Sequence, residues 1–247
     1  IKENIGTLSS LPVVYGDLAC ILYTSGTTGL PKGVMISNNQ INGEAAAFKD
    51  IFKTSVGDVI GYFASFSFIA AARMYASLMF GECCRIFNEI EQKDSLLLIN
   101  SLKEHEISDL ILPPSLGIPI FEKENIKLKY LILAGAKLNE LTNKQSATKL
   151  VNFYGSTETI MSIVNIFDIN ENIDENVPVG HAVPNTWAYI LDCDGMQLPI
   201  GVTGEICVSN DYLSPGYYNI QNLSEVAGEV RADKNIGLKK DLPPKAP

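Results

Sequence analysis

Short apolar segments alternate along the chain with longer segments in which apolar side chains recur every three or four residues. The short segments predict strands at residues 18–23, 33–36, 59–64, 83–87, 109–112, 130–134 and 151–154. The longer segments predict helices at residues 39–52, 70–80, 94–105 and 139–150. Strands that alternate with helices favour crossover connections between parallel strands. The pattern therefore predicts an α/β fold with a mostly parallel sheet flanked by helices.

Local features refine three of these elements. Ser37 or Asn38 is expected to cap the helix at 39–52, because either side chain can accept a hydrogen bond from the first turn. The continuous apolar run from Leu18 to Tyr23 predicts a buried strand. One face of the helix at 94–105 is expected to be buried, and it consists of Leu96, Leu97, Ile99 and Leu102.

Helical spacing stops after about residue 178. Two further strands are predicted at TWAYILD (186–192) and GEICVS (204–209), with a turn-rich segment between them. From about residue 225 the chain is polar and ends in a proline-rich run. We expect three parts: an α/β core at 12–177, a small C-terminal β appendage at 178–224 and a linker or tail at 225–247.

Composition and charge exclude several classes of protein. The 247 residues are 46% hydrophobic and 19% charged, which is typical of a globular protein with a buried core. The net charge of −9 argues against binding to nucleic acid. Arg73 and polar residues interrupt the apolar stretch at 59–84, and the N-terminus resembles no secretory signal, so no membrane contact is expected. The five cysteines, without C-x-x-C spacing, favour neither disulfides nor zinc and fit a cytoplasmic location.

The segment from Tyr23 to Gly33 carries the clearest chemical signal. It reads YTSGTTGLPKG and combines small hydroxyl residues, glycines and one lysine directly after a predicted strand. Backbone N–H groups in such a loop can approach an anion closely, and hydroxyls and a cation can complete the contacts. The spacing matches neither the Walker nor the Rossmann pattern. The loop is predicted to hold phosphate.

The order of several motifs resembles that of the adenylate-forming superfamily and, within it, the adenylation domains of nonribosomal peptide synthetases. Residues 23–33 match the family signature YTSGTTGxPKG. Residues 152–159, NFYGSTET, are similar to its second signature, with Ser156 where proline is usual. Further resemblances lie, in family order, at 112–115, 131–136, 198–208 and 215–217, so that the similarity spans about residues 12–224.

This resemblance implies ATP and Mg²⁺ as cofactors and gives roles to residues of both signatures. Lys32, Thr157 and Glu158 are implied as catalytic residues, with Thr157 donating to the α-phosphate and Glu158 binding Mg²⁺. Tyr154 is implied to lie against adenine. The other nucleotide-binding residues that the resemblance implies are Thr24, Ser25, Gly26, Thr27, Thr28, Gly29, Gly135, Ala136 and Gly155.

The activity implied by the resemblance is the adenylation of a carboxylic acid to an acyl-adenylate and pyrophosphate. The acyl group would then pass to the phosphopantetheine thiol of a carrier protein, with other synthetase domains as partners. An acyl-CoA synthetase-like ligase and a non-catalytic scaffold are alternatives. The Thr-Gly-Asp segment and C-terminal lysine of full-length members are not found in this sequence, so an excerpt of a larger synthetase or a catalytically weak remnant is expected.

Ile69 departs from the family pattern at an informative position. Members that activate α-amino acids carry an aspartate there, which pairs with the substrate ammonium group. Because an ammonium buried without a counter-charge is unfavourable, the substrate is predicted to be a keto, hydroxy, aryl or aliphatic acid without an α-amino group. The residues that match the family's substrate pocket are Ile69, Ala70, Arg73, Ile111, Ile132, Ala134, Phe153, Met161 and Ser162.

Arg73 is the charged residue of this pocket set, and two hypotheses apply to it. Its guanidinium could bind a second carboxylate or a keto oxygen of the substrate. Alternatively, its side chain could extend along the helix and place the guanidinium in solvent.

Overall fold

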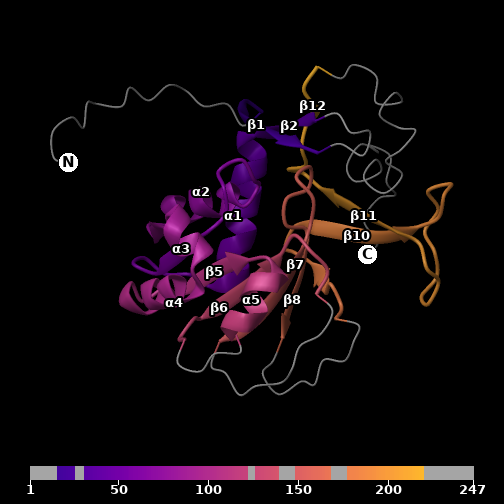
Figure 1. The fold of residues 1–247 in the computed structure, drawn as a ribbon. Helices are drawn as coiled ribbons and strands as arrows, with labels where there is room; N and C mark the ends of the chain where they lie inside the picture. The colour runs from indigo at the N-terminus through magenta and orange to yellow at the C-terminus, as the bar shows by residue number, and fades with distance from the viewer. Residues whose placement is uncertain (1–15, 26–30, 122–125, 139–147, 168–176, 220–247) are drawn as a thin grey trace.

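A computed structural model describes residues 16–25, 31–121, 126–138, 148–167 and 177–219 (Figure 1). The helices in this part of the chain are α1 (Asn38–Phe52), α2 (Ala71–Met79), α3 (Glu89–Lys93), α4 (Ser95–Glu104) and α5 (Pro114–Phe121). The first strands are β1 (Leu18–Thr24), β2 (Lys32–Ser37), β3 (Val59–Tyr62), β4 (Cys83–Ile86), β5 (Asp109–Leu112) and β6 (Tyr130–Ala134). The later strands are β7 (Lys149–Tyr154), β8 (Ile163–Phe167), β9 (His181–Ala182), β10 (Thr186–Leu191), β11 (Glu205–Asn210) and β12 (Gly216–Tyr217).

The largest sheet has seven strands in the order β4-β3-β5-β6-β7-β8-β9. The five strands from β4 to β7 are parallel to their neighbours, whereas β8 and β9 are added antiparallel. This arrangement confirms the predicted α/β class with a mostly parallel sheet. The sequence pattern did not predict β8 and β9. β8 follows β7 through the described residues 155–162, which contain no helix.

Helices cover both faces of this sheet, and alternate residues of β6 show which helices lie on which face. Leu131 and Leu133 are fully buried in one cluster with side chains of α4 and α5. Tyr130 and Ile132 belong to a second cluster with side chains of α1 and α2. Both faces of the sheet are therefore apolar, as expected for parallel strands between two layers of helices.

The first helix begins as predicted. The Ser37 side chain accepts a hydrogen bond from the backbone N–H of Gln40 at 3.2 Å, which identifies Ser37 rather than Asn38 as the cap of α1. Lys53, at φ 47°, ends the helix in the left-handed conformation. Ser37 is both the last residue of β2 and the cap of α1, so no loop separates the strand from the helix.

We expect Ser37→Ala to lower the free energy of unfolding by about 1 kcal/mol, since the mutation leaves a buried helix N–H without its acceptor. Denaturant unfolding followed by circular dichroism measures this change. Asn38→Ala is the matched control, because no hydrogen bond of the Asn38 side chain was found among the described residues. A larger loss in Asn38→Ala than in Ser37→Ala would contradict the assignment of the cap.

The first two strands form a hairpin outside the large sheet. β1 pairs antiparallel with β2, and β12 pairs antiparallel with the other side of β2. The prediction that Leu18 to Tyr23 is buried is wrong: Leu18 is 46% exposed and Tyr23 is 63% exposed. Among the described strands β1 pairs with β2 alone, and it leaves part of its apolar run in contact with solvent.

Two other sequence predictions need correction. On the predicted buried face of α4, Ile99 and Leu102 are buried as predicted, but Leu96 and Leu97 are exposed and Leu98 is buried in their place. Asp94 caps α4 by accepting hydrogen bonds from the N–H groups of residues 96 and 97, and this places the two leucines on the solvent side of the first turn. In the helix predicted at 139–150, residues 139–147 lie outside the described ranges, and Lys149 and Leu150 begin β7.

The C-terminal part divides its strands among three sheets. β10 and β11 form a two-stranded antiparallel sheet, which confirms the two strands predicted there. However, β9 extends the large sheet and β12 pairs with β2. The domain boundaries at 12–177, 178–224 and 225–247 stay a prediction.

No helix in the described ranges is long and apolar enough to span a bilayer. All five cysteines are free thiols.

Candidate active site

A cavity of about 450 Å³ opens at the carboxyl ends of the parallel strands. Its walls include Phe63 after β3, Pro113 after β5, Gly135 after β6 and Gly155 after β7. Ligands of open α/β sheets bind at this edge, because the loops that follow the strands converge there. The fold thus provides a binding site of the size of a small organic molecule.

Six of the residues predicted for the substrate pocket line this cavity: Ile69, Ala70, Ile111, Ala134, Phe153 and Met161. Three others do not reach it. Ile132 is fully buried between the sheet and the helices α1 and α2. Ser162 is 1% exposed, and its hydroxyl donates a hydrogen bond to the carbonyl of Thr159.

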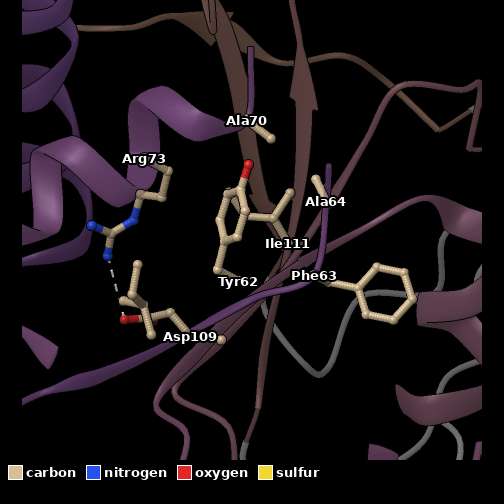
Figure 2. A pocket seen from close by; sticks show the side chains of 9 residues that line it. Tyr62, Phe63, Ala64, Ala70, Arg73, Asp109 and Ile111 are labelled. Carbon is tan, nitrogen blue, oxygen red and sulfur yellow. Dashed lines mark ion pairs between the residues drawn. The ribbon is translucent and has the colours of Figure 1, made fainter. Parts of the chain in front are cut away.

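Arg73 is the third residue outside the cavity, and the hypothesis that its guanidinium lies in solvent is wrong. The side chain is 3% exposed and forms ion pairs with Glu82 at 3.0 Å and Asp109 at 3.7 Å. Its guanidinium also lies 5.1 Å from the ring centroid of Phe48. Figure 2 shows Arg73 and Asp109 paired at one side of a small second cavity of about 10 Å³.

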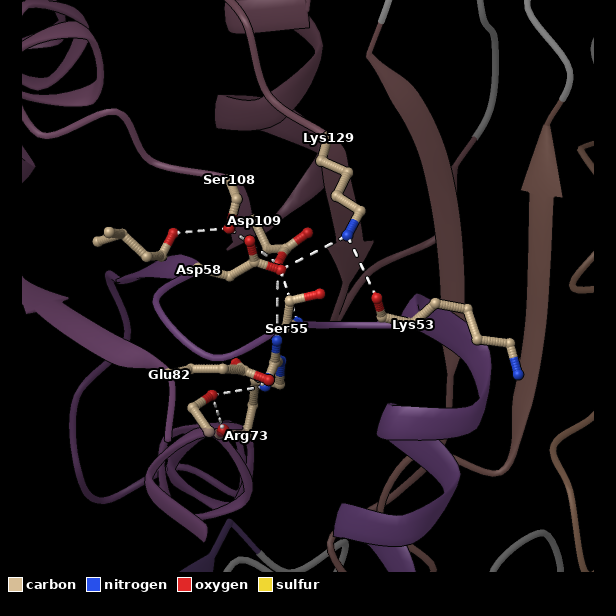
Figure 3. A network of polar contacts seen from close by, with 10 residues as sticks. Lys53, Ser55, Asp58, Arg73, Glu82, Ser108, Asp109 and Lys129 are labelled. Carbon is tan, nitrogen blue, oxygen red and sulfur yellow. Dashed lines mark hydrogen bonds and ion pairs between the residues drawn. The ribbon is translucent and has the colours of Figure 1, made fainter. Parts of the chain in front are cut away.

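The carboxylate of Asp109 joins this cluster to a wider polar network (Figure 3). Burial raises the pKa of Asp109 to about 6, although the charge of Arg73 and the hydroxyl of Ser108 lower it. Ser108 donates to Asp109 and also to the carbonyl of Val59, the first residue of β3. On the solvent side, Lys129 pairs with Asp58 at 3.5 Å. These contacts hold together the amino ends of β3, β5 and β6.

The second signature forms a tight turn between β7 and β8. The N–H of Ser162 donates to the carbonyl of Tyr154 at 3.1 Å, and the N–H of Ser156 donates to the hydroxyl of Thr159 at 3.2 Å. Ile160 has a φ of 53° and directs its carbonyl at Gly155. A Cβ on Gly155 would lie 1.6 Å from that oxygen, so only glycine fits at this position.

Glu158 connects this turn with the sheet that carries the first signature. Its carbonyl accepts hydrogen bonds from the Gln40 side chain at 3.0 Å and from the N–H of Ser214 at 2.9 Å. Its carboxylate accepts a hydrogen bond from the Tyr217 hydroxyl at 2.7 Å. Tyr217 is paired in β12 with Val34, two residues after Lys32 in β2. The structure therefore brings the two signatures to neighbouring places.

Those of the expected nucleotide-binding residues that fall in the described ranges lie on the two signatures or at the large cavity. Thr24 and Lys32 are paired at the ends of β1 and β2, and Ser25 follows Thr24. Lys32 is 8% exposed and has no ion-pair partner within the described residues. Thr157 is half-buried and Tyr154 is 43% exposed. Gly135 and Gly155 line the large cavity, and Ala136 is exposed beside it. Gly26, Thr27, Thr28 and Gly29 lie outside the described ranges.

The Glu158 carboxylate fits a Mg²⁺ ion. No cluster of three or more metal-ligating side chains was found in the described ranges. Mg²⁺ commonly binds one or two carboxylates and takes its other ligands from substrate phosphates and water. Glu158 is half-buried, and Tyr217 orients one of its carboxylate oxygens. A single carboxylate held in this way is compatible with a cation that arrives together with a nucleotide.

Sequence reasoning missed Gln40, Glu44 and Tyr217. Gln40 and Glu44 are almost fully buried, at 0% and 3% exposure, and Glu44 lines the large cavity. A signal was present in the pattern, because both polar residues share the helix face of Phe48 at intervals of four. Tyr217 could not be found in this way, since its role depends on the pairing of β12 with β2.

The fold and the junction of the two signatures define an AMP-binding enzyme, and comparison with known proteins shows this family directly. The sequence pattern of the family described as "AMP-binding enzyme" matches residues 8–218. The chain belongs to this family.

Within the family, the relatives include peptide synthases. Gramicidin S synthase 1 of Brevibacillus brevis is 32% identical over 228 residues, covering 91% of this chain and 21% of that protein. Tyrocidine synthase 1 of Brevibacillus parabrevis is 34% identical over 212 residues, covering 84% and 20%. These matches confirm the resemblance to adenylation domains of nonribosomal peptide synthetases. The chain spans about a fifth of the length of these curated relatives.

Two solved structures share the fold. The crystal structure of CmiS6 has a TM-score of 0.75 at 22% identity and covers 85% of this chain and 52% of its own. The N-terminal subdomain of Klebsiella oxytoca NpsA, solved with 3-hydroxyanthranilyl-AMSN, has a TM-score of 0.71 at 23% identity, with coverages of 87% and 56%. At these identities the likeness concerns the fold.

Proposed function

We propose that this chain forms the nucleotide- and acid-binding part of an adenylation domain, which activates a carboxylic acid with ATP and releases pyrophosphate. The observation that carries this proposal is the hydrogen bond between Tyr217 and Glu158, which joins the second signature to the strand of Lys32. The cavity lined by Gly155 lies next to this junction and offers a place for the acid.

The chemistry explains why these groups are needed together. In-line attack of a carboxylate on the α-phosphorus brings one negative charge onto ATP, which already carries about four. Lys32 supplies a cation from a largely buried position, and Thr157 supplies a hydroxyl donor on the opposite turn. Bound at Glu158, Mg²⁺ would neutralise phosphate charge. The chain's own residues thus orient the triphosphate and stabilise charge that develops during the reaction.

The apolar cavity wall supports an acid that lacks an α-amino group. Ile69 lines the cavity at the position of the family aspartate and offers no counter-charge to an α-ammonium. A keto, hydroxy, aryl or aliphatic acid meets this condition. The acyl group would then pass to the phosphopantetheine thiol of a carrier protein, which together with other synthetase domains is the proposed partner.

Acid-dependent exchange of labelled pyrophosphate into ATP tests this function in the full protein chain. We expect exchange with at least one acid of these classes and a loss of about 100-fold in Glu158→Gln, which keeps the shape and removes the charge. Glu104→Gln, on the exposed end of α4, is the matched control and should keep full exchange.

Calorimetric titration with ATP and Mg²⁺ separates this function from a non-catalytic scaffold. The enzyme hypothesis requires binding that weakens in Glu158→Gln and in Lys32→Ala. Absence of both nucleotide binding and exchange in the unmodified protein would instead support the scaffold.

A further inference from the structure

Glu44 is a buried carboxylic acid whose oxygens have no partner. It lies on α1 with 3% of its surface exposed. Neither carboxyl oxygen has a hydrogen-bond partner among the described residues. Glu44 also lines the large cavity, and it is the one ionisable side chain among the described residues that do so. An unsatisfied buried acid is unfavourable on its own, so its position in a binding cavity points to a ligand.

The other polar side chains of the cavity wall are already engaged. The amide of Gln92 donates to the carbonyls of Phe63 and Phe87 at 2.8 and 3.1 Å. The Ser65 hydroxyl is in hydrogen-bond contact with both the backbone N–H and the hydroxyl of Ser67. Glu44 is therefore the polar group in this wall that a bound molecule can satisfy.

The surrounding charges favour a cation as its partner. Arg73 lies near enough to lower the pKa of Glu44, but burial has the larger effect and raises that pKa well above its ordinary value. The guanidinium of Arg73 is already shared between two buried carboxyl groups, those of Glu82 and Asp109. The charge of Glu44 also raises the pKa of Tyr212, although burial raises it more. The Tyr212 hydroxyl is already hydrogen-bonded to the Thr186 hydroxyl and to the carbonyl of Pro184. An additional positive charge would balance this cluster, whereas an anion would add repulsion.

The Arg73 cluster lies directly behind the cavity wall. Phe63, Ala64, Ala70 and Ile111 line both the large cavity and the small one that holds the Arg73–Asp109 pair (Figure 2). Because these residues are apolar, little solvent separates the cavity from the buried charges, and an ammonium group there would interact with them strongly.

We propose that Glu44 binds a protonated amino group of the acid substrate, and that this amino group stands at a carbon other than the α-carbon. The inference rests on the proposed function, since it takes the cavity as the acid-binding site. It agrees with Ile69, which offers nothing to an α-ammonium. Glu44 is then a specificity-determining residue on α1, outside the nine pocket positions predicted from the sequence.

Matched pairs of acids, in which an ammonium group replaces a methyl group of similar size, test this proposal by pyrophosphate exchange and by calorimetric titration in the full protein chain. The pairs are 2-aminobutanoic and 2-methylbutanoic acid, 3-aminobutanoic and 3-methylbutanoic acid, and 5-aminopentanoic and hexanoic acid. We expect kcat/KM to favour the amine by about 100-fold in at least one of the last two pairs, and not in the first.

Glu44→Gln and Glu44→Leu should abolish that preference, with Glu44→Leu favouring the methyl acid, while ATP affinity stays unchanged. Both variants should unfold at the same or a higher temperature than the unmodified protein, because they remove an unpaired buried carboxyl. The Glu104→Gln variant should keep the preference.

Two results would overturn the proposal: no amine is preferred in any pair, or the preference survives in Glu44→Gln. If acids bind with this preference but no exchange occurs, the Glu44 inference stands and the proposed catalytic function fails. If exchange occurs without an amine preference, the proposed catalytic function stands and the Glu44 inference fails.

Discussion

Arg73→Met is expected to lower the free energy of unfolding by about 3–5 kcal/mol. The substitution preserves much of the side-chain volume but removes the cation that faces Glu82 and Asp109. Loss of one partner from a buried ion pair leaves the other charge uncompensated, and this costs far more than the pair itself contributes. Denaturant unfolding monitored by fluorescence and circular dichroism measures the change.

Lys93→Met is the control for the Arg73 variant. Lys93 pairs with Glu89 at 3.5 Å on the surface, where solvent surrounds both side chains. An exposed pair of this kind contributes little, so a change within about 0.5 kcal/mol is expected. Equal losses in the two variants would show that the buried cluster has no special role in stability.

The effect of Arg73→Met should depend on pH. With the pKa of Asp109 raised to about 6, the native state holds a proton that the unfolded chain has released, so stability from this group falls as pH rises from about 4 through 6. Arg73, Lys129 and Ser108 lower this pKa and Asp58 raises it. Without Arg73 the carboxyl should hold its proton more tightly, so the variant should lose less stability at pH 5 than at pH 8.

Gly155→Ala is expected to cost about 3 kcal/mol or more and to abolish pyrophosphate exchange. The new methyl group would lie 1.6 Å from the carbonyl oxygen of Ile160, and neither group is on a flexible side chain. The turn must therefore open, which displaces Thr157 and Glu158 from the junction with β12. Thermal unfolding and exchange assays report the two consequences.

Gly16→Ala serves as the matched control, because a Cβ at Gly16 would meet no atom of the described residues within 4 Å. We expect this variant to be as stable and active as the unmodified protein. A Gly155→Ala variant with normal exchange would show that the turn is more adaptable than the structure indicates.

The layers of the fold were predictable from the sequence, because buried strands appear as short apolar runs and helices as apolar residues spaced every three or four positions. Ile132 and Leu133 are both apolar, as a strand covered on two faces requires, and the run around them identified β6. β8 and β9 escaped prediction, since an antiparallel addition needs no intervening helix. The exposure of β1 also escaped, because an apolar run does not reveal whether its strand lies at an edge.

The candidate site was only partly predictable from the sequence. Contiguous motifs marked Lys32 and the turn from Tyr154 to Glu158 as candidates, because each motif lies in one short segment of the chain. Their roles stay a prediction. The partners of Arg73 could not be predicted from the sequence. Glu82 precedes β4 and Asp109 begins β5, and tertiary packing brings both carboxylates to the guanidinium. The same reason applies to Tyr217, which is 59 residues away from Glu158 along the chain.

The pairing of β12 with β2 limits how this chain can be recombined with related sequences. β12 supplies the hydroxyl that orients Glu158, and the N–H of Tyr218 donates to the carbonyl of Gly33 at 2.7 Å. A chimera that takes residues 32–37 from one parent and 214–218 from another would pair two segments whose side chains are not matched to each other. Productive crossover points should therefore keep both segments from the same parent.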